Sequence, residues 1–184
     1  MTASTDVLSE FVRGLSDGSI AVIDLTHPLG PETPMIKVPE GHGKQPPTTS
    51  LETISDYRKD GGYARWSTLT TAEHSGTHFD TPSHWFTGGK FENATTDTIS
   101  AERFVAPACV IDCTAEVKED EDFILTAGRI RAWELEYGEI PAGSWVLLHS
   151  GWARRFYNAD KFLNQVDGIA HSPGPSPDAV HLMI

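Results

Sequence analysis

Three histidines and one aspartate lie close together in the run His74-Ser75-Gly76-Thr77-His78-Phe79-Asp80-Thr81-Pro82-Ser83-His84. Imidazole nitrogens and a carboxylate oxygen suit Zn²⁺, Mn²⁺ or Fe²⁺, and three protein ligands leave one coordination position open for water. A metal-dependent hydrolase requires such an open position, because the ion there activates the attacking water. The residue types therefore indicate a hydrolytic metal site, with a structural hydrogen-bond network of the same side chains as the alternative.

A regular helix or a straight strand cannot bring these four side chains together. On a helix, the first two histidines share a face, whereas the aspartate and the last histidine project from nearly the opposite side. In a straight strand all four face one way, but the ends of the run lie roughly 33 Å apart. Gly76 and Pro82 are the residues able to bend the chain, so we expect turns at these positions.

The bent run predicts a role for each of its chemical groups. We expect His78 and Asp80 to be adjacent metal ligands on a short extended piece. His74, folded back at Gly76, is the expected third ligand. His84 is expected nearby, as a base or as a group that hydrogen-bonds the ligands.

Strands and helices alternate irregularly along the chain, which indicates an α+β or irregular mixed α/β fold. Apolar patterning predicts strands over 21–26, 64–73, 104–114 and 144–149, with the first strand buried and the last buried on both faces. Helices are predicted over 1–14, from the N-cap Thr126 to Gly138, and from the N-cap Ser176 onward. The strand over 64–73 leads into the histidine run and is expected to position it.

The length of 184 residues predicts one domain over 1–184, large enough to bury a core. Within it we expect an N-terminal helix inside 1–18 and an extended loop region over 30–66, whose irregular start is typical of a functional loop. The apolar end Leu182-Met183-Ile184 follows the last predicted helix start by one or two turns. This abrupt end predicts a chain that is cut short.

Composition limits the classes of partner. The formal net charge of −12, with no basic stretch to offset it, argues against nucleic acid and against an anionic membrane surface. No apolar run is long enough to span a bilayer, and the start does not read as a signal peptide.

Cys109 and Cys113 would lie about 13 Å apart on a strand, too far for a disulfide. Free thiols favour a cytoplasmic protein.

The histidine run matches the H-x-G-T-H-x-D-x-P-x-H signature of the metal-dependent cyclase-like hydrolases, the family typified by bacterial kynurenine formamidase and isatin hydrolase. Every fixed position of that pattern is filled here. Four further segments resemble parts of the family. Residues 24–29 resemble its first strand and turn, and residues 107–112 resemble its second core strand. Residues 140–152 resemble its I-P-x-G-x-x-V-L-L-x-T-G-W segment, and residues 173–176 resemble its P-G-L-S turn.

The resemblance implies a swivelling β/β/α fold and a metal-activated water that opens an amide, formamide or lactam C–N bond of a small substrate. It implies His74, His78 and Asp80 as ligands of Mn²⁺ or Zn²⁺, with His84 as a nearby catalytic group. It also implies a homodimer or homotetramer. The family continues for several more strands, which supply a further His and a Glu-type group, so the fold is expected to be incomplete at the C-terminus.

In the hydrolase interpretation, Asp80 orients a histidine or bridges to a second metal, and His84 relays the proton to the leaving nitrogen. Trp66, Trp85 and Phe86 flank the run in sequence and would form an apolar wall for a planar, aromatic substrate. Their alternative is an ordinary place in the core. His27 would line the pocket or serve a turn, and the remaining histidines are expected at the surface or in the core: His42, His149, His171 and His181.

Two other functions compete with hydrolysis. The pair His78-x-Asp80 is also the first half of the 2-His-1-carboxylate triad of iron oxygenases. That function needs a distal histidine such as His149, and an arginine such as Arg154 or Arg155 to hold a co-substrate carboxylate. The second alternative is a non-catalytic metal-binding fragment.

Overall fold

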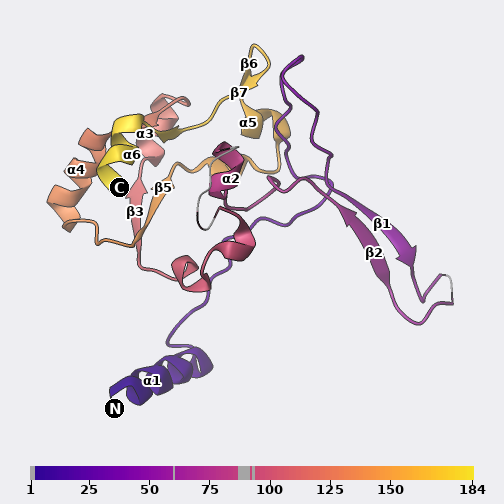
Figure 1. Cartoon of the computed structure of the whole chain (residues 1–184), viewed down its shortest axis with the longest axis horizontal. Coiled ribbons are helices and arrows are strands. Elements are labelled where there is room, and N and C mark those ends of the chain that lie inside the picture. The colour runs from indigo at the N-terminus through magenta and orange to yellow at the C-terminus, as the bar shows by residue number, and fades with distance from the viewer. Residues whose placement is uncertain (1–2, 60, 87–91, 93) are drawn as a thin grey trace.

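The computed structural model describes residues 3–59, 61–86, 92 and 94–184. Two parallel strands, β3 (Ala108–Asp112) and β5 (Trp145–His149), lie in its main body (Figure 1). Cys109 pairs with Val146, and Ile111 pairs with Leu148. These strands confirm the two predicted strands that follow the histidine run. The mixture of helices and short strands confirms the expected mixed α and β fold class.

The core lies where three helices pack beside this strand pair: α3 (Thr114–Glu119), α4 (Ala127–Tyr137) and α6 (Pro177–Met183). Ile111, Leu125 and Ile130 are its largest fully buried side chains, followed by the smaller Cys113. Burying one such side chain contributes about 1.5–3 kcal/mol relative to leaving it in water. Packing in this half of the chain therefore forms the main body of the structure.

Side-chain caps fix the starts of two core helices. Thr126 Oγ1 accepts a hydrogen bond from Arg129 N at the start of α4, and Gly138 ends that helix with a φ of 97°. Ser176 Oγ accepts from Ala179 N at the start of α6. Both predicted helix starts are confirmed, because the cap residues satisfy free backbone N–H groups locally.

Short elements connect these helices and strands. They are α2 (Pro82–Trp85), η1 (Thr96–Thr98), η2 (Ala101–Phe104), β4 (Ile124–Leu125), η3 (Trp152–Arg155), α5 (Ala159–Leu163), β6 (Gln165–Val166), β7 (Ile169–Ala170) and β8 (Gly174–Pro175). β4 pairs with β8 in parallel, and β6 pairs with β7 as a small antiparallel hairpin. The β4–β8 pair brings the segment that precedes α6 beside the core.

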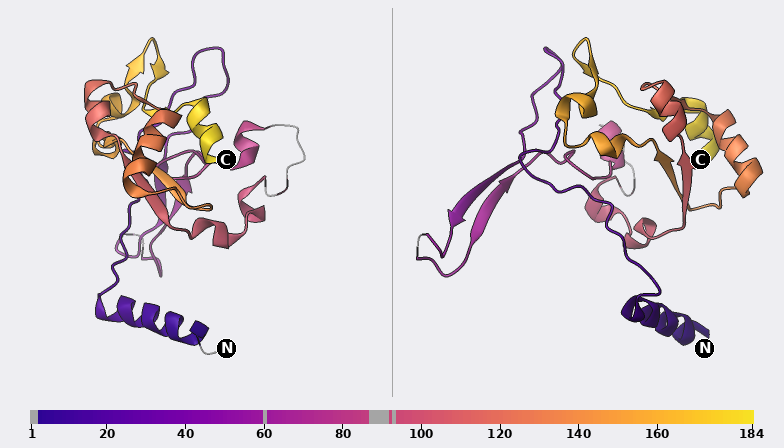
Figure 2. Two further views of the ribbon diagram at one scale, coloured as in Figure 1. Left: turned by 90° about the vertical axis from the view of Figure 1, so that its left-hand side faces the viewer. Right: turned by 180° about the vertical axis from the view of Figure 1, so that it is seen from behind.

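Two elements project from this body. Helix α1 (Ala3–Asp17) stands apart at the end of an extended segment, and the antiparallel hairpin of β1 (Ser50–Ser55) and β2 (Trp66–Thr70) points away in another direction (Figures 1 and 2). The helix and the β2 strand were both predicted. The strand β1 lies inside the region 30–66, where the sequence predicted only an extended loop.

Two predictions about buried strands are wrong. Residues 21–26 form no strand, and Val22, Ile23 and Leu25 are each more than 70% exposed. No strand of the described residues pairs with this segment, and backbone without a ladder partner is not held as a strand. β5 is partly exposed at Trp145 and Leu147, because β3 is its one neighbour within the described part of the chain.

The cysteines are free, as predicted: Cys113 is buried and Cys109 is half-buried. Burial raises the pKa of the Cys113 thiol above its ordinary value. Among the described residues, no helix combines the length and the apolar character that a bilayer crossing needs.

Candidate metal centre

The chain bends at Gly76, as the sequence predicted. Gly76 has a φ of +64°, a backbone conformation that glycine adopts without steric cost. The bend follows β2 closely and carries the chain from His74 back toward His78. An extended piece then places Asp80 against both rings.

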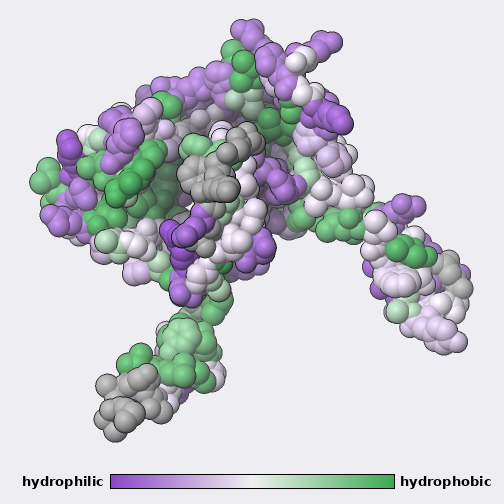
Figure 3. All heavy atoms as spheres, viewed as in Figure 1, coloured by the Kyte–Doolittle hydropathy of each residue, from purple (hydrophilic) through white to green (hydrophobic). Residues whose placement is uncertain are grey.

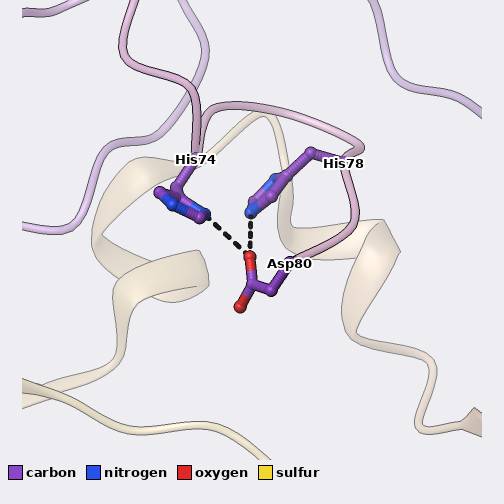
Figure 4. A group of neighbouring side chains, drawn as sticks. All are labelled: His74, His78 and Asp80. Carbon is purple, nitrogen blue, oxygen red and sulfur yellow. Dashed lines mark hydrogen bonds and ion pairs between the residues drawn. The ribbon is translucent and has the colours of Figure 1, made fainter. Parts of the chain in front are cut away.

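One oxygen of Asp80 is the point on which the two imidazole rings converge (Figure 4). Asp80 Oδ1 lies 2.7 Å from His74 Nδ1 and 3.3 Å from His78 Nε2. The two ring centroids are 5.2 Å apart, at an interplanar angle of 73°. One ligand atom from each of the three residues falls within 4.8 Å of the others. The structure thus brings together the three predicted ligands, whose role as ligands stays a prediction.

The hydrogen bonds of His78 leave a lone pair facing the carboxylate. His78 Nδ1 lies 2.9 Å from the Gly76 carbonyl oxygen, which can only accept, so Nδ1 carries the proton. In the neutral ring, Nε2 is then unprotonated and faces Asp80 Oδ1 at 3.3 Å. Two lone pairs at this distance repel each other unless a proton or a cation lies between them. The geometry therefore suits a bound cation.

His74 offers a free ring nitrogen in addition to that of His78. Its Nδ1 donates to the Asp80 carboxylate. Its Nε2 is buried and makes no hydrogen bond to any described residue, although Glu73 Oε1 lies 3.3 Å away. Buried polar atoms normally have a partner, so this nitrogen is also available to an ion. Two imidazoles and one carboxylate fit Mn²⁺ and Zn²⁺ equally in chemical type.

The predicted catalytic residue His84 packs against this group from α2. Its ring centroid lies 3.8 Å from that of His74, at an angle of 43°, and the Trp85 ring meets it edge-on at 4.7 Å. His84 N donates to the Thr81 carbonyl oxygen, which begins the turn at the proline. The structure therefore places His84 beside a predicted ligand, and its catalytic role stays a prediction.

A cavity of about 490 Å³ opens beside the two histidines. His74, Thr77 and His78 line one part of it, and an aromatic set from the later chain lines another: Trp152, Phe156 and Phe162. His27 lines it too, stacked on the Phe156 ring at 4.0 Å with an interplanar angle of 3°. His27 N also donates to Thr77 Oγ1 at 3.1 Å, which ties this wall to the histidine run.

The other predicted substrate-binding residues lie elsewhere. Trp66 begins β2 on the projecting hairpin, whereas Trp85 and Phe86 belong to α2 and its end, and all three are exposed. None of them is among the described residues that line this cavity. Their contact with substrate stays a prediction.

Sequence reasoning missed the aromatic residues of the cavity. Trp152, Phe156 and Phe162 follow the histidine run by many residues, so no spacing within the run could indicate them. The one available signal was the G-W segment of the resemblance, which contains Trp152. It gave no hint that this tryptophan faces the site.

His149, the distal ligand of the oxygenase alternative, does not join the group. It lies beside Asp112, with Nδ1 3.5 Å from Oδ2, at the ends of the paired strands β5 and β3. Arg155 pairs with Glu121 and lies over the Trp152 ring. Within the described ranges, the group of side chains that could hold a metal ion consists of His74, His78 and Asp80.

The family match, the sequence relatives and the solved structures that resemble this chain agree with one another. Residues 23–184 match the Cyclase family model. The chain is 42% identical to isatin hydrolase of Roseibium aggregatum over 182 residues, which are 99% of this chain and 69% of that protein. A crystal structure of an isatin hydrolase bound to the product analogue thioisatinate has a TM-score of 0.92 at 43% identity, covering 100% of this chain and 70% of that chain. Isatin hydrolase A from Ralstonia solanacearum has a TM-score of 0.90 at 43% identity, covering 97% and 67%.

Proposed function

Because this chain belongs to the cyclase family and is a metal-dependent hydrolase of a non-peptide C–N bond, we propose that its substrate is a small aromatic lactam of the isatin type. The family and the cyclase-like fold expected from the histidine run are both confirmed by the family match and the structural likeness. The hydrolase class is confirmed with them, whereas the substrate is our proposal.

One observation carries the proposal: the two histidines that converge on Asp80 also line the aromatic cavity. Ion and substrate would therefore meet at the same surface. The stacked pair of His27 and Phe156 lines the cavity with aromatic surface, which suits a planar ring. Isatin is such a ring with an internal amide, and the relatives that carry its name are 42–43% identical to this chain over the aligned residues.

We propose that His74, His78 and Asp80 hold one Mn²⁺ or Zn²⁺ ion. A bound ion of this type polarises the scissile carbonyl and activates water. Asp80 orients the His74 ring by accepting a hydrogen bond from its Nδ1, and the Gly76 carbonyl orients the His78 ring by keeping its proton on Nδ1. These contacts hold the unprotonated nitrogens in place before an ion arrives, which limits the reorganisation that binding requires.

We propose His84 as the group that accepts a proton from the attacking water. Its ring packs on His74, so it lies beside the predicted ligand set. Trp85 meets the His84 ring edge-on and would keep that imidazole in position. Trp66 and Phe86 remain part of the proposal as aromatic contacts to substrate.

The test compares wild type with Asp80→Asn, each supplied with Mn²⁺ or Zn²⁺. Elemental analysis measures metal per chain, and the absorbance change on ring opening measures isatin turnover. We expect about one ion per chain and turnover in wild type, and loss of both in the variant, because an amide is a poorer ligand than a carboxylate.

Asp160→Asn is the matched control, because it makes the same change at an exposed position in α5. It should keep metal and activity. A wild type that holds metal but opens no isatin would contradict the substrate proposal and favour a metal-binding function. Metal that survives in Asp80→Asn would contradict the ligand set.

We further propose that the chain forms a homodimer or a homotetramer. Support comes from α1 and the β1–β2 hairpin, which project from the body with exposed apolar side chains, among them Phe11, Leu51 and Trp66. A lone two-stranded hairpin is marginally stable in water, and so is a lone helix of this length. A second copy that covers these faces would stabilise both elements.

For location we propose the cytoplasm. The support is the pair of free cysteines, because reduced thiols persist in that compartment. Neither nucleic acid nor a membrane surface is proposed as a partner, in keeping with the strongly acidic composition.

A further inference from the structure

A histidine far from the metal-binding run also lines the cavity. His171 follows the β6–β7 hairpin and lines the same cavity as His74 and His78. We propose that His171, held by Asp122, donates the proton that the leaving nitrogen takes up when the C–N bond breaks. This inference rests on the proposed lactam hydrolysis and assigns a second acid–base residue to it.

The fold places Asp122 beside His171 through a strand pair. In the parallel pairing of β4 with β8, Ile124 is opposite Gly174 and Leu125 is opposite Pro175. Asp122 precedes β4, and His171 precedes β8, so the register that pairs the strands also brings these two side chains together. His171 Nδ1 lies 3.0 Å from Asp122 Oδ1.

Main-chain hydrogen bonds fix both partners. His171 N donates to the Leu163 carbonyl oxygen at 3.1 Å, and Leu163 itself lines the cavity. Asp122 N donates to Asp120 Oδ1 at 3.0 Å, which holds the loop between α3 and β4. The imidazole is therefore anchored by its backbone and by its ring, as a group that acts at a defined point must be.

The Asp122 bond decides which nitrogen can act. A carboxylate only accepts, so Nδ1 carries a proton, and Nε2 is the nitrogen left for substrate. The carboxylate also stabilises the imidazolium, as the aspartate does in a hydrolase triad. The side chain is 33% exposed, so it can regain a proton from solvent after each turnover.

The two histidines then take different parts of one reaction. A C–O bond forms between water and the carbonyl carbon, and the proton of that water passes to His84. The C–N bond breaks with its electron pair on nitrogen. Nitrogen then receives the Nε2 proton of the His171 imidazolium, which becomes a neutral imidazole with its proton on Nδ1. His84 is not among the described residues that line the cavity, whereas His171 is, so His171 is better placed for the leaving group than His84, which the sequence suggested.

The experiment uses isatins whose 5-substituents range from electron-donating to electron-withdrawing, so that the leaving aniline varies in basicity. Wild type, His171→Gln, Asp122→Asn and the control His181→Gln are compared, with His181 exposed on α6. Each variant is also checked for metal per chain and for its melting temperature.

We expect His171→Gln to lower kcat about 10²–10⁴-fold on the most basic leaving group, and less on the most activated one. Asp122→Asn should act in the same direction with a smaller loss, which keeps the test valid if His171→Gln folds poorly. Metal content should be unchanged, and His181→Gln should match wild type.

Two results would overturn this inference while leaving the proposed function intact. One is an unchanged kcat and an unchanged dependence on the leaving group in a folded His171→Gln. The other is a rise in KM alone, which would make His171 a binding contact. A wild type that opens no isatin would instead remove the proposed function, and this inference with it.

Discussion

The bond between the His78 ring and the Gly76 carbonyl oxygen decides which nitrogen of that ring can bind an ion. It holds the proton on Nδ1 and turns Nε2 toward Asp80 Oδ1. A carbonyl oxygen as the partner of a ligand histidine is a common way of fixing the tautomer and raising ligand basicity. The glycine that bends the chain thus also orients a predicted ligand, through its own backbone.

Gly76→Ala tests this local geometry. The φ of +64° is costly for a residue with a Cβ, and an added Cβ would lie 3.2 Å from Leu29 Cδ1. We expect the unfolding free energy to fall by about 1–2 kcal/mol and metal to bind more weakly. Chemical denaturation and metal titration measure the two effects.

Gly128→Ala is the control for this change. Gly128 lies in α4 without a positive φ, and an added Cβ would meet the Thr126 side chain at an ordinary 3.7 Å. We expect it to stabilise the chain by about 0.5–1 kcal/mol. Equal effects of the two alanines would contradict the role given to Gly76.

His84→Ala separates catalysis from metal binding. His84 packs on His74 but is outside the group that converges on Asp80. We expect metal per chain to stay at the wild-type value while kcat for isatin falls about 10²–10⁴-fold. A wild-type rate would show that His84 has no acid–base role, and loss of the metal would show that it is a ligand.

At the scale of elements, one arginine joins three pieces of the core. Arg129 of α4 donates from Nε to Glu116 of α3 at 2.9 Å, and from Nη2 to the Asp112 carbonyl oxygen at the end of β3 at 2.8 Å. The hydrogen bond from Arg129 lowers the pKa of Glu116 below its ordinary 4.5. The ion pair therefore links the helices to the end of the strand.

This pKa shift predicts how stability depends on pH. A carboxylate whose pKa is lowered by folding stabilises the folded chain above the unfolded value, here 4.5. That contribution is lost as the pH falls through the lower folded pKa. We expect the unfolding free energy of Glu116→Gln to depend less on pH than that of wild type below about pH 5, by denaturation from pH 7 to pH 3.

Glu119→Gln in the same helix is the control, because it removes a carboxylate that is not the partner of Arg129 in the described core. It should follow the wild-type curve. A Glu116→Gln curve parallel to wild type would show that the ion pair is screened by solvent, as exposed pairs usually are.

At the scale of the whole molecule, the chain exposes more surface than a monomer of its mass should. Its accessible area is 14451 Å², whereas a compact monomer of 20.1 kDa exposes about 8,700 Å². Apolar side chains gather on α1 and on parts of the body in the space-filling view (Figure 3). The difference exceeds the area of about 800 Å² that each partner buries in an ordinary interface.

The excess of exposed surface area predicts that the chain self-associates. A charge introduced on the apolar side of α1 should weaken that association. Phe11 lies on the exposed apolar side of α1, with Leu8, Val12 and Leu15. Light scattering after size exclusion should give a multiple of 20.1 kDa for wild type and a smaller mass for Phe11→Glu. Burying a new carboxylate in an apolar interface is the physical cause.

Ser16→Glu is the control, because it adds the same charge at an exposed position of α1 whose side chain is polar. It should keep the wild-type mass. A wild type with the mass of one chain would contradict the homo-oligomer.

Local features of this protein could be predicted from its sequence. The bend at Gly76, the cap residues Thr126 and Ser176, and the convergence of the histidine run all depend on groups a few residues apart. Glycine conformation, proline stiffness and side-chain capping act at that range, whatever the rest of the chain does. The same run also indicated the family, because its fixed residues carry the chemistry.

Features that need distant partners were decided by the tertiary structure alone. Residues 21–26 have the apolar pattern of a strand, but a strand needs a neighbour, and the described residues place none beside them. His171 meets Asp122 because β4 pairs with β8, and Phe156 meets the histidine run through His27, which stacks on its ring and donates to Thr77. Sequence spacing sets which groups are close along the chain, whereas burial and strand pairing set which of them meet across it.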